Sequence, residues 1–419
     1  MYFSNLNYCI MMFDLIGVHP EKGYTFKQIF WYLFTLVFWQ LTVIYLAILY
    51  IVYKEDITIE DVTSSLETFF MTFHGVIKLN LLFYKRKNVR DLLHRMKHFW
   101  RADEVENAVE RKEHLNQLKF LKRVFIIYNF ICICTTISFT CKTFFMEGDY
   151  LTFTTYKPEW IPFYALLFYE GIAFVYGVYL PVPGIDMFIV TTFILTKIQF
   201  KMLNEEIGRI FSEGSGPNIV DVNTRLKKCA DHHVFLLDYV NRINTTFSTG
   251  MLGYVAIIVL SMCVEMYIVL STQTSIVSFI KGAMYIANGL IQYILCYCIP
   301  AQAITDEADR TANYTYFNNW HEHLTPSMKT AQIMIISRAQ KKTLILAGGF
   351  IKVDLEACLK VSRHTSEATI LLFPNPNRGR IKARHWRLVP HSNNCIWEKT
   401  IKTMVSYAMF IRTIGIRGK

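Results

Sequence analysis

Charged side chains are scarce in this sequence. Asp, Glu, Lys and Arg make up 18% of its 419 residues, whereas hydrophobic residues make up 53%. About a quarter of the residues of an ordinary soluble domain are charged. The composition therefore excludes an ordinary soluble protein of this length and indicates an integral membrane protein.

The sequence also lacks the cysteine and histidine spacings of a disulfide framework or a metal site. His232-His233 and His321-x-His323 have no Asp, Glu or Cys frame with zinc spacing, so we interpret them as polar loop histidines and expect no metal and no cofactor. Six of the ten cysteines fall inside apolar runs and are interpreted as small buried hydrophobes: Cys132, Cys134, Cys141, Cys263, Cys296 and Cys298.

Enzyme signatures are missing too. No nucleophile elbow, phosphate loop or pair of metal ligands occurs in the sequence, so we do not expect an enzyme. The first twenty residues have no basic segment ahead of an apolar one and no small-residue cleavage site, so we expect no signal peptide.

Long apolar runs are what the sequence does contain. A helix needs roughly 20 apolar residues to cross about 30 Å of hydrocarbon. The fourth run is too long for one perpendicular span and is broken by Pro181, Pro183 and Gly184, so it predicts a long helix that is kinked or tilted. Six runs predict membrane spans: 29–53, 62–84, 124–145, 161–202, 247–270 and 276–299.

Basic residues gather in alternate connections between these runs. The formal net charge is +11, and its basic residues concentrate in 85–123, in the polar segment after residue 202, and in 305–342. Lys and Arg favour the cytoplasmic side of a membrane, so this pattern predicts three inside loops rather than a nucleic-acid surface. With one further span near the end, it predicts about seven spans, a cytoplasmic amino terminus and an extracellular carboxyl terminus.

Several stretches resemble one family, the insect odorant receptors. They are MMFDLIGVHP before the first span, YKPEWIPFY in an outer loop, VPGIDMFI in the fourth span, SRAQKKTLILAGGFIKVDLEACLK, and KTMVSYAMFIRTI near the end. The resemblance covers the chain except for one block, 361–400. It implies an all-α membrane protein of seven transmembrane helices whose topology is inverted relative to G-protein-coupled receptors.

The resemblance also implies a mechanism. The family's chains form ligand-gated, non-selective cation channels in which four subunits surround one pore lined by the last helix of each. A chain like this one would be the tuning subunit, assembled as a heterotetramer with a co-receptor in the plasma membrane of olfactory neuron dendrites. Volatile odorants would bind in the outer half of the membrane, between spans two, three, four and six.

Aromatic residues on those spans are the candidates for such a pocket. Tyrosine offers an apolar body and a hydroxyl, which suits small and weakly polar ligands. The alternative is that these side chains pack between helices. The candidates are Phe69, Phe70 and Phe73 on span two, Phe139 and Phe144 on span three, Tyr169, Ile172, Tyr176 and Tyr179 on one face of span four, and Tyr285 on span six. We interpret Asp186, after the PVPG break, as a cap of the restarted helix.

The segment 337–360 is predicted to be a basic turn, an apolar helix, a hinge at Gly348 and Gly349, and a second apolar helix that restarts at Phe350. The polar, proline-containing block 361–400 cannot continue a membrane helix. We interpret the block as a retained intron or a gene-model error, with an authentic insertion as the alternative.

On this interpretation the pore helix is split into 347–360 and 401–419. The resemblance places the pore gate at Tyr407 and Phe410, and the alternative is that both face lipid. The predicted division of the rest is a cytoplasmic segment (1–28), six spans with the pocket (29–299) and a cytoplasmic anchor (300–346).

Two other receptor classes remain open. A gustatory receptor is a related channel, but its usual Thr-Tyr ending is replaced by Val405-Ser406-Tyr407. A G-protein-coupled chemoreceptor would have an extracellular amino terminus and an Asp-Arg-Tyr-like triplet after its third span, and the sequence has neither feature.

Overall fold

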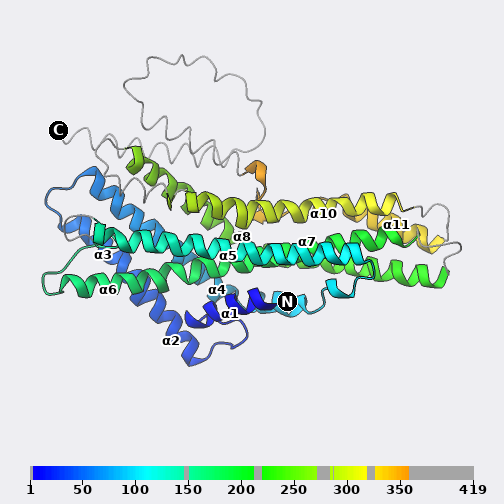
Figure 1. Cartoon of the computed structure of the whole chain (residues 1–419), viewed down its shortest axis with the longest axis horizontal. Helices are drawn as coiled ribbons and strands as arrows, with labels where there is room; N and C mark the ends of the chain where they lie inside the picture. The colour runs from blue at the N-terminus through cyan, green and yellow to red at the C-terminus, as the bar shows by residue number, and fades with distance from the viewer. Residues whose placement is uncertain are drawn as a thin grey trace, which may run out of the picture.

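Long helices dominate the structure, a computed structural model that describes residues 3–145, 151–211, 219–270, 284–285, 287–318 and 326–357. Most of these helices lie side by side along the longest axis of the molecule (Figure 1). The helices are α1 (Phe3–Leu15), α2 (Phe26–Phe34), α3 (Thr42–Tyr53), α4 (Ile59–Met96), α5 (Ala108–Phe145), α6 (Phe163–Phe174), α7 (Pro181–Arg209), α8 (Ile219–Leu270), α10 (Ile299–Tyr316) and α11 (Pro326–Ala339).

Three π-helical segments join helices into continuous spans. Thr35–Leu41 joins α2 to α3, Val175–Tyr179 joins α6 to α7, and Gln292–Cys298 leads into α10. The described part therefore accounts for the first five predicted spans and for most of the sixth. The predicted seventh span from residue 358 onward, the block 361–400, Tyr407, Phe410, His321 and His323 lie outside the described residues.

Helix α7 forms the centre of the bundle. It continues α6 as one apolar helix, Phe163–Arg209, and most of its side chains are buried on every face, as expected of a helix surrounded by others. Pro181 and Pro183 directly follow the π-helical turn and lack the amide protons that a continuous helix would use there. The carbonyl of Gly177 in that turn accepts a hydrogen bond from the Gln40 side chain at 2.8 Å. The predicted long fourth helix is confirmed, and its irregularity lies in the π-helical turn just before these prolines.

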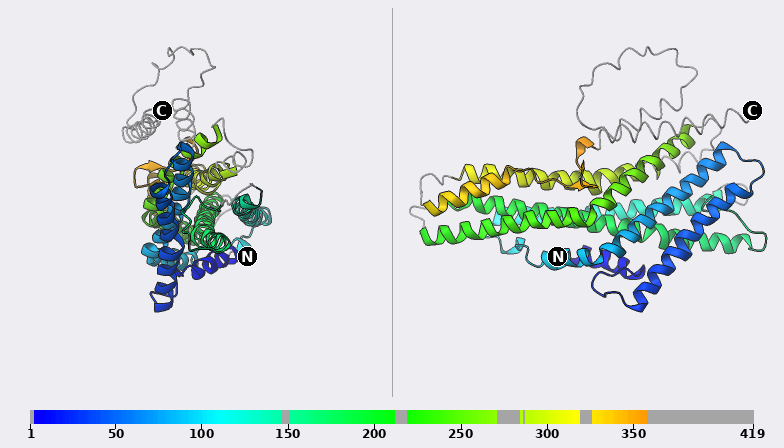
Figure 2. Two further views of the ribbon diagram at one scale, coloured as in Figure 1. Left: turned by 90° about the vertical axis from the view of Figure 1, so that its left-hand side faces the viewer. Right: turned by 180° about the vertical axis from the view of Figure 1, so that it is seen from behind.

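The polar connections are not loops, and this part of the prediction is wrong. Helix α4 runs on to Met96 and α5 begins at Ala108, so the basic connection 85–123 is mostly helical. Helix α8 has 52 residues, about 80 Å at 1.5 Å per residue, far more than a bilayer requires. The polar halves of the long helices therefore extend the bundle beyond the length that a bilayer requires, and we call this extension the polar bundle. The right-hand view of Figure 2 shows the molecule from behind.

Ion pairs and buried side chains hold this polar bundle together. Arg209 pairs with Glu110 at 2.5 Å, and Arg95 pairs with Asp238 at 2.9 Å, each between different helices. His232 is buried in α8, stacks on Trp100 with ring centres 4.0 Å apart, and contacts Gln199 at 3.2 Å. The interpretation of His232 and His233 as loop residues is thus wrong, because both lie on the buried face of a helix.

The segment after α11 is a β-hairpin rather than two helices joined by a hinge. Strand β1 (Leu346–Ala347) pairs antiparallel with β2 (Ile351–Lys352), with Leu346 opposite Lys352. Gly348 (φ +63°) and Gly349 (φ +80°) form its turn. The prediction that a helix restarts at Phe350 is wrong, because Ile351 and Lys352 form a strand and the next helical residue is Leu355.

Helix α8 holds the hairpin in place. The Asn244 side chain donates to the Leu344 carbonyl at 2.8 Å and accepts from the Leu346 amide at 3.0 Å. The amide of Gly348 donates to the Ser248 carbonyl, also at 2.8 Å. The hairpin thus completes its backbone hydrogen bonds on α8 and links that helix to the start of the predicted last span.

We predict that Gly348→Ala destabilises the protein more than Gly349→Ala. Both positions have positive φ, which costs a residue with a Cβ about 1–2 kcal/mol. A Cβ at Gly348 would also lie 2.6 Å from Leu252 and 2.9 Å from Phe350, whereas a Cβ at Gly349 meets nothing within 4 Å. Because the ends of those two side chains can shift, the extra cost is about 1 kcal/mol. Thermal unfolding of the purified variants measures the difference, and equal melting temperatures would contradict the described turn.

Candidate functional site

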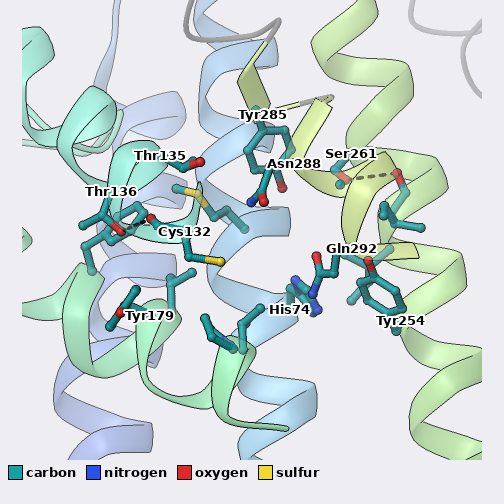
Figure 3. A pocket seen from close by; sticks show the side chains of 18 of the residues that line it. His74, Cys132, Thr135, Thr136, Tyr179, Tyr254, Ser261, Tyr285, Asn288 and Gln292 are labelled. Carbon is teal, nitrogen blue, oxygen red and sulfur yellow. Dashed lines mark hydrogen bonds between the residues drawn. The ribbon is translucent and has the colours of Figure 1, made fainter. Parts of the chain in front are cut away.

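A cavity of about 70 Å³ lies inside the helical bundle, lined by α4 to α8 and the described start of the sixth span. Figure 3 shows the side chains around it, with His74 from α4, Cys132 and Thr135 from α5, and Asn288 and Gln292 from the sixth span. Its lining consists of Met71, His74, Tyr128, Cys132, Thr135, Thr136, Phe174, Val178, Tyr179, Val182, Pro183, Tyr254, Ile257, Ile258, Ser261, Met262, Tyr285, Asn288, Gly289 and Gln292.

This lining combines apolar, aromatic and a few polar side chains. Among the described residues that form it, none is Asp, Glu, Lys or Arg. Cavities of this kind, mostly apolar with a small number of polar groups, suit small neutral molecules. Met71 and Met262 are unbranched and adaptable, so the cavity can adjust to ligands of different outline.

A buried ion pair lies beside the cavity. Lys78 Nζ on α4 contacts Asp186 Oδ1 on α7 at 2.5 Å, and the Lys78 and Asp186 side chains are 3% and 0% exposed. Tyr128 donates its hydroxyl to Asp186 Oδ2 at 2.9 Å, and Gln292 and Tyr297 also donate to this carboxylate. Four helical segments therefore meet at one carboxylate.

These contacts correct the interpretation of Asp186 as a helix cap. Its two oxygens accept from side chains of other helices, and its carboxylate satisfies a cation that would otherwise be unpaired in the membrane interior. Tyr128 and Gln292 line the cavity and also bond to Asp186. A ligand that displaces either side chain would therefore act directly on the buried ion pair.

Two of the ten predicted pocket residues line this cavity, Tyr179 and Tyr285. Phe139 lies one layer outside it, fully buried, with ring centres 5.7 Å from Phe174 and 6.0 Å from Tyr285. The side chain of Phe144 lies outside the described set. Whether any of these residues contacts a ligand stays a prediction.

Two of the remaining predicted residues on span four, Tyr169 and Tyr176, pack against another helical segment. Tyr169 and Tyr176 stack on Trp39, at 5.4 and 5.9 Å between ring centres, and Ile172 does not line the cavity either. The π-helical turn Val175–Tyr179 is the reason. It shifts the helical register by one residue, so that Tyr179 turns into the cavity while Tyr169 and Tyr176 turn away from it.

The predicted phenylalanines of span two do not line the cavity. Phe69 packs against Phe70 and Phe73, with ring centres 5.5 and 5.4 Å apart. Phe73 is 36% exposed on the outside of the bundle. The face of α4 that reaches the cavity is instead the one carrying Met71 and His74.

Helix α8 contributes a wall that the sequence interpretation missed. Tyr254, Ile257, Ile258, Ser261 and Met262 all line the cavity from this helix. Their spacing of three and four residues marks one helical face. The signal was present, since a tyrosine and a serine share this face inside an otherwise apolar run.

A connecting segment packs against Phe174, which lines the cavity. Glu170 is fully buried and accepts hydrogen bonds from the Phe153 amide, at 2.9 Å, and from the Thr155 hydroxyl. The Phe153 ring stacks on Phe174 at 5.7 Å. Glu170 thus fastens the segment between α5 and α6 over the aromatic layer that adjoins the cavity.

Comparison with known proteins agrees with this architecture. The family model described as 7tm Odorant receptor matches residues 58–365. Odorant receptor 82a of Drosophila melanogaster is 24% identical over 333 residues, covering 73% of this chain and 82% of the Drosophila protein. The structure of the insect olfactory receptor OR5 from Machilis hrabei superposes with a TM-score of 0.72 at 12% identity, covering 89% of this chain and 99% of that one.

The same Machilis receptor in complex with eugenol also superposes with a TM-score of 0.72, at 13% identity, covering 88% of this chain and 98% of that one. The all-α membrane fold expected from the apolar runs is therefore confirmed. Four helices of the described part are long and apolar enough to cross a membrane, and the more polar α4 packs against α8 and α3. The family match covers well over half of the sequence, so this chain belongs to the 7tm odorant receptor family.

Proposed function

We propose that this odorant receptor is the tuning subunit of an odorant-gated, non-selective cation channel that it forms with a co-receptor. The observation that carries the proposal is the largely apolar cavity inside a bundle of the odorant receptor fold. The eugenol complex of the Machilis receptor supports a small organic ligand for this fold. In this proposal the amino terminus is cytoplasmic and the chain works in the plasma membrane of olfactory neuron dendrites.

The ligand acts through the contacts between the cavity and the buried ion pair. Tyr128 and Gln292 belong to the cavity wall and hold Asp186, which anchors Lys78 of α4. A ligand that moves either side chain changes the packing between α4, α5, α7 and the sixth span. The ligand then shifts the equilibrium toward the open state to the extent that it binds the open state more tightly than the closed state.

Expression with and without a co-receptor tests this proposal. We expect cells that carry both chains to show inward cation current when exposed to a panel of small volatiles, and cells with this chain alone to show none. A parallel form that lacks residues 361–400 tests the predicted interruption of the pore helix. We expect this form to give a larger current than the full chain, because the block separates the two parts of that helix. Current without any co-receptor would contradict the partnership, and current of equal size from both forms would contradict the interruption.

A further inference from the structure

Three buried polar atoms that line the cavity have no hydrogen-bond partner within the described residues. They are His74 Nε2 on α4, Tyr254 Oη on α8 and Asn288 Oδ1 on the sixth span. Tyr254 is only 2% exposed. Folded proteins satisfy the great majority of such buried atoms, so three around one cavity indicate a partner from outside the described residues.

The three groups reach the cavity from three different helices. The rings of His74 and Tyr254 stack with centres 4.8 Å apart, and both residues line the cavity. Asn288 stands one helical turn before Gln292, whose amide donates to Asp186. In Figure 3, Gln292 lies between Asn288 and His74, and Tyr254 lies beside Gln292.

Hydrogen-bonding capacity narrows the class of partner. The Asn288 carbonyl oxygen can only accept, so the partner must carry a donor, while the Tyr254 hydroxyl can donate as well as accept. Charged partners are excluded because the described lining has no Asp, Glu, Lys or Arg, and Lys78 and Asp186 already pair with each other. A neutral hydroxyl group is both donor and acceptor and meets these demands.

We propose that the ligand of this cavity is a small neutral alcohol or phenol. Its hydroxyl donates to Asn288 Oδ1 and accepts from Tyr254, next to the stacked His74 ring, while its hydrocarbon part lies against Met71, Phe174 and Ile258. Tyr254 and Asn288 are then the residues that select for the hydroxyl. This inference rests on the proposed function, since it takes the cavity to be the ligand site.

Binding of three matched probes to the purified full-length chain in lipid nanodiscs tests the inference. Hexan-1-ol can donate and accept, methyl pentyl ether can only accept, and heptane can do neither, although all three have the same number of non-hydrogen atoms. Affinities come from the ligand-dependent shift in melting temperature. The variants that remove a polar group are Tyr254→Phe and Asn288→Leu. Thr135→Leu is the comparison, because it fills part of the cavity and leaves the Tyr254 hydroxyl and the Asn288 amide in place.

We expect wild type to bind hexan-1-ol about five- to a hundredfold more tightly than heptane, with the ether between them or equal to heptane. Tyr254→Phe and Asn288→Leu should each lose most of this preference and keep their affinity for heptane. Thr135→Leu should weaken all three probes.

Two results would overturn the inference. The first is equal affinity of wild type for all three probes, which would show that water rather than the ligand satisfies these atoms. The second is a preference for hexan-1-ol over heptane that stays unchanged in both Tyr254→Phe and Asn288→Leu. Failure of the proposed function looks different. In that case wild type would bind none of the probes, or Thr135→Leu would leave every affinity unchanged.

Discussion

Replacing Lys78 with methionine is expected to destabilise the protein by about 3–5 kcal/mol, because the change leaves the Asp186 carboxylate buried without its cation. Lys78 and Asp186 are fully enclosed, so solvent cannot stand in for the missing partner. Asp186→Asn should be similarly costly, since it leaves the Lys78 ammonium unpaired in the membrane interior. Thermal unfolding of the purified variants and their level at the cell surface measure the loss.

The double variant Lys78→Met with Asp186→Asn separates the charge from the packing. It removes both charges and keeps an acceptor oxygen for Tyr128, so we expect it to recover most of the stability that either single change loses. Lys54→Met is the matched control, because Lys54 pairs with Asp61 in a more exposed place and such pairs contribute about 0–1 kcal/mol. A double variant as unstable as the worse single one would show that the ion pair is not the source of the effect.

Gly75→Ala is expected to have the second large effect. A Cβ at Gly75 of α4 would lie 2.0 Å from the backbone oxygen of Gly177, in the π-helical turn before α7. That oxygen already accepts a hydrogen bond from Gln40 at 2.8 Å, so neither backbone can move aside without losing it. We expect a loss of about 3 kcal/mol or more and little receptor at the cell surface.

Gly171→Ala provides the control, on the span that carries Gly177. Gly171 lies in α6, where a Cβ would meet nothing within 4 Å. Alanine there should be neutral or stabilise the helix by up to about 1 kcal/mol. If Gly75→Ala were as well tolerated as Gly171→Ala, the described approach of α4 to the π-helical turn would be wrong.

The membrane fold could be predicted because the signal for it is local. Residues 29–53 contain no charged residue, and the break at Pro181 and Pro183 stands inside one long apolar run. Each span is identified by its own composition and length. The same local interpretation failed for the polar connections, where the basic residues of α4 and α5 suggested an inside loop although both helices continue through them.

The site could be predicted only in part, because it depends on register and on distant contacts. Tyr169 and Tyr179 share a face in an ideal helix, but the π-helical turn between them separates their directions. Asp186 looks like a cap when only its neighbours in sequence are considered, yet its partner Lys78 is 108 residues away. Gly348 and Gly349 correctly indicated a sharp backbone turn, whereas the two-residue strands beside them are too short to show a pattern.

Odour-evoked current in Thr135→Leu and Thr140→Leu tests the central claim, that the cavity is where the ligand acts. Thr135 and Thr140 are both on α5, and each hydroxyl bonds to the carbonyl four residues earlier, so the chemical change is the same. Only Thr135 lines the cavity. With the co-receptor present, the account predicts that Thr135→Leu raises the ligand concentration for half-maximal current at least about tenfold, while Thr140→Leu leaves it unchanged. Equal responses of the two variants, at equal surface levels, would contradict it.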